Sequence, residues 1–212
     1  MNPNKILLVI DCQNDFITGS LAVQGAEDIA KRLTTYIERN WSNYSAIVYT
    51  LDSHPYNHCS FVEQGGQWPT HCIMLSEGWM LYPDLRELIE NINLQGGFAV
   101  PIYKGMSPNQ EEYSAIANKE NIDIFKAYSD GKEIDVCGIM SEYCVHDTVE
   151  AICKLKTNPT VPTYDQRVRL LTDLIVTTDN HAKLKTLLTK YPNIKFVNNS
   201  FSEYTPTEAN QF

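Results

Sequence analysis

The chain has 212 residues, 43% of them hydrophobic and 20% charged, which fits one globular domain over residues 1–212 and excludes a disordered or fibrous protein. With 17 lysines and arginines against 26 aspartates and glutamates, the formal net charge is −9 and no basic run compensates it, so we expect no nucleic-acid partner. No segment approaches the roughly 18 apolar residues that span a bilayer, and residues 1–11 lack the features of a secretion signal, so we expect a cytoplasmic protein without a membrane partner.

Short apolar runs rich in β-branched residues alternate along the chain with amphipathic segments. The first run, residues 6–10, has no polar residue, as expected for a strand that is buried on both faces. Six strands are predicted, at residues 6–10, 46–49, 98–103, 134–139, 174–176 and 194–197. Five helices are predicted between them, at residues 26–39, 84–91, 111–117, 143–155 and 180–190. Residues 198–212 are predicted to form a polar C-terminal tail.

The alternation of strands and helices predicts a single-domain, three-layer α/β fold. We expect a six-stranded, mostly parallel sheet with helices on both faces, because right-handed crossovers connect parallel strands. In such sheets, ligands bind beyond the carboxyl ends of the strands. Four consecutive strand ends carry reactive or ligand-type side chains, namely Asp11, the pair Asp52 and His54, Lys104, and the segment 140–144 that ends in Cys144.

The chain has six cysteines and no C-x-x-C pair, which is too few for a disulfide scaffold and indicates free thiols. Cys144 stands at the start of a predicted helix, where backbone N–H groups and the helix dipole favour a thiolate and can also stabilise an oxyanion. A buried structural thiol explains Cys144 alone at least as well, since free cysteine is usually buried.

Asp11 closes an apolar strand, where a carboxylate is costly unless it is paired or functional. A carboxylate beside a thiol can act as a general base, and a lysine beside both can hold the thiolate. Taken singly, Asp11 and Lys104 are explained by an ordinary loop acid and a solvated lysine. Their shared location at one end of the sheet favours a catalytic cluster with Cys144.

Asp52 and His54 offer two metal ligands from one extended segment, and His71 offers a third from the next loop. Three N and O ligands with open positions suit a catalytic divalent ion such as zinc, iron or manganese. A hydrogen bond between Asp52 and His54, without a metal, explains that pair equally well. His58 is either a fourth ligand or a residue that shapes the loop.

Four aromatic residues lie close in sequence to these polar residues: Phe16, Trp68, Tyr113 and Tyr143. Aromatic rings between catalytic groups can stack on a planar substrate. We therefore treat the four as candidate substrate-binding residues, although each one alone is also explained by packing in the core.

Seven strings occur in one order along most of the chain: VIDCQNDF at 9–16, GSLAV at 19–23, DSHPYNHCSF at 52–61, WPTHC at 68–72, KG at 104–105, YSA at 113–115 and GIMSEYCV at 138–145. On these strings the chain resembles the nicotinamidase/pyrazinamidase branch of the isochorismatase-like cysteine hydrolases. The resemblance implies that nicotinamide, and also pyrazinamide, is hydrolysed with release of ammonia through a thioester, as part of NAD salvage.

The resemblance also implies a role for each catalytic residue. Cys144 would be the nucleophile, Asp11 the base that takes its proton, and Lys104 the cation that supports both. The backbone N–H groups of Met140 and Cys144 would form the oxyanion hole, with the Ile139–Met140 peptide in the cis form.

For the ligands, the resemblance implies one divalent metal ion held by Asp52, His54 and His71, to which the pyridine nitrogen of nicotinamide coordinates. Zinc is the first choice, and iron or manganese suits the same ligand set. Phe16 and Trp68 would sandwich the substrate ring.

The chain departs from the family pattern at three places, which are Ser141-Glu142 in place of Thr-Asp, residues 74–78 after the third ligand, and Glu111-Glu112 in place of Asp-Ser. Two alternatives remain: a related cysteine hydrolase of carbamoyl or ureido compounds, and a catalytically silent binding module. The three metal ligands argue against the first, and the complete catalytic trio argues against the second. Sheet proteins of this kind often associate, so a homo-oligomer is an alternative to a monomer.

Overall fold

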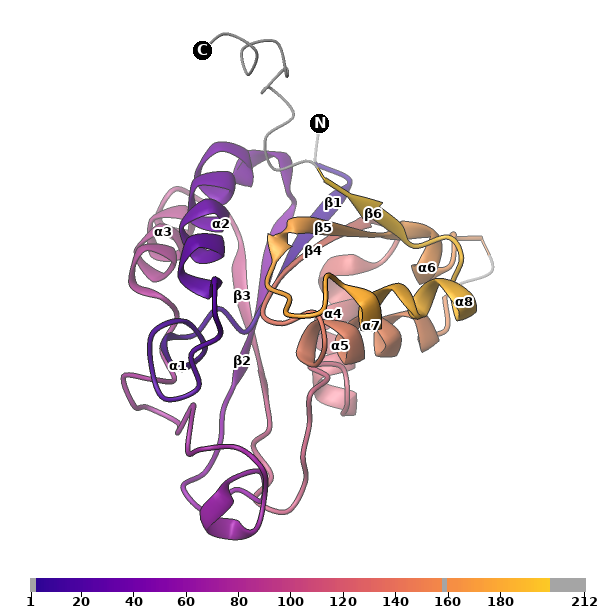
Figure 1. The fold of residues 1–212 in the computed structure, drawn as a ribbon. Coiled ribbons are helices and arrows are strands. Elements are labelled where there is room, and N and C mark those ends of the chain that lie inside the picture. The colour runs from indigo at the N-terminus through magenta and orange to yellow at the C-terminus, as the bar shows by residue number, and fades with distance from the viewer. Residues whose placement is uncertain (1–2, 158–159, 199–212) are drawn as a thin grey trace, which may run out of the picture.

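A six-stranded sheet forms the middle layer of the molecule (Figure 1). The structure, a computed structural model, describes residues 3–157 and 160–198. The strands are β1 (Lys5–Ile10), β2 (Ala46–Asp52), β3 (Ala99–Lys104), β4 (Glu133–Gly138), β5 (Val168–Ile175) and β6 (Lys195–Val197). They lie in the order β3-β2-β1-β4-β5-β6, and every neighbouring pair is parallel. The predicted α/β class is confirmed, and the sheet is wholly rather than mostly parallel.

Helices cover both faces of the sheet, as predicted (Figure 1). The helices are α1 (Asn14–Ile17), α2 (Ala26–Asn40), η1 (Trp41–Asn43), η2 (Val62–Gln64), α3 (Pro83–Leu94), α4 (Lys119–Ser129), α5 (Cys144–Lys154), α6 (Tyr164–Arg167), α7 (Ala182–Lys185) and α8 (Leu187–Lys190). Successive side chains of a strand point to opposite faces, so β1 supplies Leu7 and Val9 to the core under α2 and α3. Its residues Ile6, Leu8 and Ile10 enter the core on the other face, with α4 and α5.

The predicted helix over residues 111–117 is wrong, because the helix of this region, α4, begins only at Lys119. Asn118 caps it by accepting a hydrogen bond from the N–H of Asn121. The segment before the cap is held by contacts to other parts of the chain instead. The N–H of Ala115 donates to the hydroxyl of Thr148 on α5, for example, at 3.1 Å.

Two further elements differ from their predicted bounds. Strand β5 starts at Val168, six residues before the predicted run at 174, because the polar Arg169 interrupts the apolar pattern. Arg169 lies within the sheet because its Nε atom is 2.9 Å from Oδ1 of Asp135 on the neighbouring strand. The predicted helix over 180–190 is divided into α7 and α8. The predicted tail, apart from residue 198, lies outside the described residues.

The carboxyl ends of the strands and the segment from 53 to 82 lie at the same end of the molecule (Figure 1). Across residues 3–157 and 160–198, none of the helices combines the length and the apolar character needed to cross a bilayer. The strand ends are where the sequence places its candidate site residues.

Candidate active site

Four predicted residues from separate strand ends meet in one buried cluster, which we call the site cluster: Asp11, Asp52, Lys104 and Cys144. Asp11 follows β1, and Cys144 begins α5 after β4. Asp52 and Lys104 end β2 and β3 and are directly paired in the sheet. The parallel register therefore brings together residues that lie up to 133 positions apart, as the numbers 11 and 144 show.

Lys104 is the centre of this cluster. Its Nζ atom lies 3.0 Å from Oδ2 of Asp11, 3.1 Å from Oδ1 of Asp52 and 3.5 Å from Sγ of Cys144. The lysine is 1% exposed, so its positive charge is shared among these three groups and not with bulk water. The arrangement can hold a thiolate beside a carboxylate.

Thr50 fixes the orientation of the Asp11 carboxylate. Its hydroxyl donates to Oδ1 of Asp11 at 2.5 Å and accepts from the N–H of Asp11 at 3.1 Å. The other carboxylate oxygen then faces Lys104. Thr50 is absent from the predicted site residues; its only sequence signal is a hydroxyl within an otherwise largely apolar strand.

Burial changes the proton affinity of both the carboxylate of Asp11 and the thiol of Cys144. Burial raises the pKa of Asp11 above its ordinary value, and Lys104 only partly opposes this. Burial also raises the pKa of the Cys144 thiol, against the influence of Lys104. Burial would lower the pKa of Lys104, but Asp11 and Asp52 more than offset it and hold that pKa well above its ordinary value. Asp11 therefore binds a proton more strongly than an ordinary aspartate, which suits a general base.

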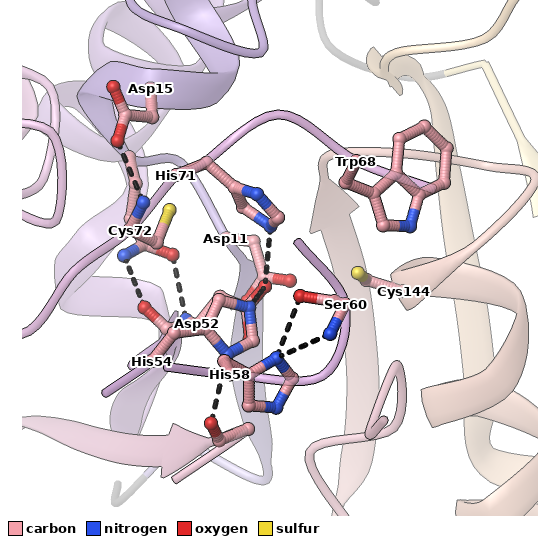
Figure 2. A network of polar contacts seen from close by, with 12 residues as sticks. Asp11, Asp15, Asp52, His54, His58, Ser60, Trp68, His71, Cys72 and Cys144 are labelled. Carbon is pink, nitrogen blue, oxygen red and sulfur yellow. Dashed lines mark hydrogen bonds and ion pairs between the residues drawn. The ribbon is translucent and has the colours of Figure 1, made fainter. Parts of the chain in front are cut away.

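The three predicted metal ligands also come together. The Nδ1 atoms of His54 and His71 are bonded to the carbonyl oxygens of Gly105, at 2.9 Å, and Pro69, at 2.7 Å. A carbonyl only accepts, so each Nδ1 carries the proton and each Nε2 keeps a lone pair for a ligand. The Nε2 atoms lie 3.0 and 3.7 Å from Oδ2 of Asp52 (Figure 2).

Ligand atoms of Asp52, His54 and His71 lie within 4.8 Å of one another, and all three residues are buried. Within the described residues, Nε2 of His54 has no hydrogen-bond partner, although it is buried. A buried polar atom without a partner is costly, and a metal ion between these atoms would satisfy it. The donor set of two imidazoles and one carboxylate thus fits a divalent ion.

His58 lies beside the three candidate ligands and makes hydrogen bonds within the loops around them. Its Nδ1 atom is 2.7 Å from the hydroxyl of Ser60 (Figure 2). Its Nε2 atom is 3.0 Å from the carbonyl of Gln110. Its ring stacks on that of His54 with centroids 3.9 Å apart. Both ring nitrogens have hydrogen-bond partners, which favours the structural role over that of a fourth ligand.

Gly105 allows the backbone after β3 to approach the metal ligands. Its φ angle of +66° is in the left-handed region, and a Cβ atom there would lie 2.5 Å from Cε1 of His54 and 2.7 Å from Oδ1 of Asp52. Its N–H donates to the carboxylate of Glu112 at 3.1 Å. This contact of Glu112 also helps to keep the 111–117 segment out of a helix.

Gln13 and Asp15 position the metal ligands, and neither is among the predicted site residues. The side-chain amide of Gln13 donates to the carbonyl of Asp52 at 2.8 Å and accepts from its N–H at 2.7 Å. The carboxylate of Asp15 accepts from the N–H of Cys72, next to His71, at 2.7 Å (Figure 2). Both residues belong to the first matched string, which was their signal in the sequence.

A cavity of about 520 Å³ opens onto the thiol. All four predicted aromatic residues line it, together with Asp52, His71, Met140 and Cys144 and with four residues that were not predicted, Leu21, Val23, Glu111 and Ile139. The indole N–H of Trp68 donates to the hydroxyl of Tyr113 at 3.0 Å, and the rings of Trp68 and Tyr143 are nearly perpendicular. An apolar, ring-lined cavity with polar groups at one side suits a small flat molecule that carries a polar substituent.

The turn before α5 has a cis peptide between Ile139 and Met140, the form that the resemblance implies. The carbonyl of Met140 accepts from the N–H groups of Tyr143 and Val145 at 3.1 and 3.2 Å. Within the described part of the chain, the N–H groups of Met140 and Cys144 have no hydrogen-bond partner. Two donors are therefore available beside the thiol.

Comparison with known proteins shows similarity over most of the chain. The isochorismatase domain family matches residues 5–163. A nicotinamidase of Escherichia coli (strain K12) is 32% identical over 171 residues, which cover 69% of this chain and 75% of the relative.

Two solved structures have a similar fold and a similar length. The pyrazinamidase of Pyrococcus horikoshii in complex with zinc has a TM-score of 0.74 and 30% identity over 92% of this chain and 99% of its own. The PnC1 protein of L. infantum in complex with nicotinate has a TM-score of 0.72 and 26% identity, and the match covers 93% of both chains.

Proposed function

The chain belongs to the isochorismatase family, and we propose that it is a metal-containing amidohydrolase that converts nicotinamide to nicotinate and ammonia and also accepts pyrazinamide. One observation carries the proposal: Nζ of Lys104 contacts Asp11, Asp52 and Cys144 at 3.0 to 3.5 Å beside an aromatic cavity. Lys104 thus contacts both the catalytic pair, Asp11 and Cys144, and the candidate metal ligand Asp52.

In the first half of the reaction, Asp11 takes the proton of the Cys144 thiol, and the sulfur attacks the carbonyl carbon of the amide. The carbonyl electrons move to oxygen, and the N–H groups of Met140 and Cys144 donate to the oxyanion. Lys104 stabilises the thiolate before the attack. Protonated Asp11 then gives its proton to the amide nitrogen, the C–N bond breaks, and ammonia leaves a thioester on Cys144.

In the second half, Asp11 takes a proton from a water molecule that attacks the thioester carbonyl. The same two N–H groups stabilise the second oxyanion. When this intermediate collapses, the C–S bond breaks, the sulfur of Cys144 regains a proton from Asp11, and nicotinic acid is released and gives its remaining proton to water to become nicotinate.

Asp52, His54 and His71 would hold the metal ion, and we propose zinc on the basis of this donor set and of the zinc-bound relative. When bound, the ion supplies a Lewis acid that can accept the lone pair of the pyridine nitrogen and orient the ring. Phe16 and Trp68, which both line the cavity, would hold the two faces of the ring.

We extend the proposal to the metabolic pathway and the cellular compartment of the enzyme. Hydrolysis of nicotinamide would belong to NAD salvage. All six cysteines are free thiols, which supports a reducing compartment such as the cytoplasm.

The test is ammonia release by purified protein with nicotinamide, pyrazinamide and an N-carbamoyl compound as separate substrates. We expect turnover of the two ring amides and none of the carbamoyl compound. The Cys144→Ala variant is the control for contaminating activity. If wild-type protein releases no ammonia from either ring amide, the proposed function is wrong.

A further inference from the structure

The turn that carries the thiol is attached to the segment after β5 through the side chain of Glu142, which is 9% exposed. Its Oε1 atom accepts from the N–H of Thr178 at 2.6 Å and from the N–H of Asp179 at 2.8 Å. The hydroxyls of Thr177 and Thr178 donate to the same oxygen at 3.0 and 3.2 Å. A single carboxylate oxygen thus gathers four donors from three consecutive residues, and such charge-assisted bonds are stronger than neutral ones.

Further bonds join the same two segments. The N–H of Ser141 donates to the carbonyl of Val176 at 2.8 Å, and the hydroxyl of Ser141 lies 3.0 Å from Nδ1 of His181. Nζ of Lys183 donates to the backbone carbonyl of Glu142 and lies 5.3 Å from the centre of the Tyr143 ring. Residues 176–183 therefore support residues 141–143 through both side chains and backbone.

These contacts matter because the turn has few hydrogen bonds within itself. Its own hydrogen bonds converge on the carbonyl of Met140, while the N–H groups of Met140 and Cys144 have no acceptor among residues 3–157 and 160–198. Donors that await an oxyanion cannot hold the turn in place before the reaction. Their position must come from neighbouring residues, and Glu142 supplies the largest number of bonds to an outside segment.

We propose that Glu142 is a positioning residue, which together with Lys183 holds residues 140–144 so that the N–H groups of Met140 and Cys144 meet the developing oxyanion. The inference rests on the proposed function, since that reaction forms the oxyanion. Glu142 is not among the residues that line the cavity. Its loss should therefore weaken the transition state more than the binding of substrate.

The kinetic experiment compares Glu142→Ala, Glu142→Gln and Lys183→Met with wild type. The matched control is Lys185→Met, because Lys185 also lies on α7 and donates to a backbone carbonyl, that of Asn180 at 2.9 Å. We expect Glu142→Ala to lower kcat about 100-fold with KM changed less than about 3-fold, since a misplacement of about 1 Å costs that much. Glu142→Gln keeps one acceptor oxygen and should lose about 10-fold, as should Lys183→Met. Lys185→Met should stay within about 2-fold of wild type.

A binding experiment separates positioning from general damage to the cavity. Nicotinaldehyde is expected to add to the Cys144 thiol, so that a C–S bond forms, the thiol proton passes to Asp11 and the aldehyde oxygen becomes an oxyanion at the same N–H groups. Nicotinate has the same ring but forms no such bond. In Glu142→Ala, the affinity for nicotinaldehyde should fall at least about 10-fold more than that for nicotinate.

The proposal is overturned if Glu142→Ala keeps kcat within about 2-fold of wild type, or if it weakens both ligands equally. If Glu142→Ala does not fold, the same two measurements are made on Glu142→Gln and Lys183→Met. An unchanged kcat, or an equal loss of affinity for nicotinaldehyde and nicotinate, overturns the proposal there too. Should wild type lack amidase activity, hydrogen exchange of the backbone at residues 140–145 decides instead. Exchange there should be about 10-fold faster in Lys183→Met than in Lys185→Met, and equal rates would refute the positioning role.

Discussion

Two buried charge clusters lie toward opposite ends of the same sheet, and they differ in charge balance. The site cluster has two carboxylates, Asp11 and Asp52, and one cation, Lys104. The other, which we call the structural cluster, has the buried carboxylate of Asp135 with two cations, Lys5 and Arg169, and the hydroxyl of Tyr44, and Arg169 also pairs with the partly exposed Glu133.

Each oxygen of Asp135 lies close to a cation or a hydroxyl group. Its Oδ1 atom lies 2.9 Å from Nε of Arg169, and its Oδ2 atom accepts from the hydroxyl of Tyr44 at 2.7 Å. The side chains of Lys5 and Arg169 are 28% and 24% exposed, so their charge is partly solvated. In the structural cluster two partly exposed cations face the buried carboxylate of Asp135, whereas the site cluster has two carboxylates for one buried cation and a thiol at a cavity. Similar groups thus serve stability at one end and chemistry at the other.

The largest effect should come from Cys144→Ala, which removes the nucleophile and leaves every ion pair of the site cluster intact. We expect kcat for nicotinamide to fall by about 10⁴-fold or more, because loss of a nucleophile leaves only binding and oxyanion stabilisation. Ammonia release measures it. The unfolding free energy should stay close to that of wild type, and a residual activity within 100-fold would remove Cys144 from the mechanism.

Metal removal tests the surplus negative charge of the site cluster. We expect the chelated protein to bind one zinc ion per chain, with a gain of about 4 kcal/mol in unfolding free energy when free zinc is roughly 1,000 times Kd. Titration calorimetry and urea unfolding measure the two quantities. His71→Ala should abolish the gain, and an Asp135→Asn chain should keep it. Stabilisation by zinc that survives in His71→Ala would place the ion elsewhere.

Asp135→Asn breaks the structural cluster and should separate stability from activity. Removing one partner of a buried ion pair leaves uncompensated charge, and we expect a loss of about 3 kcal/mol in unfolding free energy. Denaturant unfolding measures it, and kcat of the folded variant should remain near the wild-type value. A large loss of kcat without a loss of stability would contradict the division between the two clusters.

The smallest effect concerns a third group of charges, at the surface, where Glu150 pairs with Lys154 and Lys190 at 2.9 Å each. These partners lower the pKa of Glu150 from 4.5 to about 2. Because the folded pKa lies below the unfolded one, the acid stabilises the fold above about pH 4.5 and loses this effect as the pH falls toward 2. Glu150→Gln should cost about 0.5 kcal/mol at pH 7, since such pairs are partly screened, and nothing near pH 2. Unfolding curves at both pH values test this, and an equal cost at both would refute it.

The sequence is most informative where it is periodic. Runs such as residues 6–10 predict strands because a strand buried on both faces must be apolar throughout, and parallel strands place Asp11, Asp52, Lys104 and Cys144 at one end. It is least informative for the 111–117 segment, whose contacts to Gly105 and Thr148 override its local pattern. Local sequence cannot show such tertiary contacts.

The residues that orient the site also show that local sequence cannot reveal tertiary contacts. Thr50 and Gln13 make their decisive bonds across 39 positions, and Glu142 makes its bonds across 35 to 37. The matched strings include Gln13 and Glu142, but the local sequence does not show what these side chains bind, because their role depends on partners in distant segments. The residues that perform the chemistry stand at strand ends, but those that orient them require the assembled fold.

The strand order has a consequence for how the protein is made. Strand β1 lies in the middle of the sheet, yet its partner β4 begins only at Glu133, long after β1 has left the ribosome. Until then, the apolar edge of residues 6–10 has no neighbour on that side, and such an edge invites aggregation of the nascent chain. A chaperone that covers this edge should therefore raise the yield of soluble protein. The same late pairing joins the base to the nucleophile, so the appearance of enzyme activity would report the completion of folding.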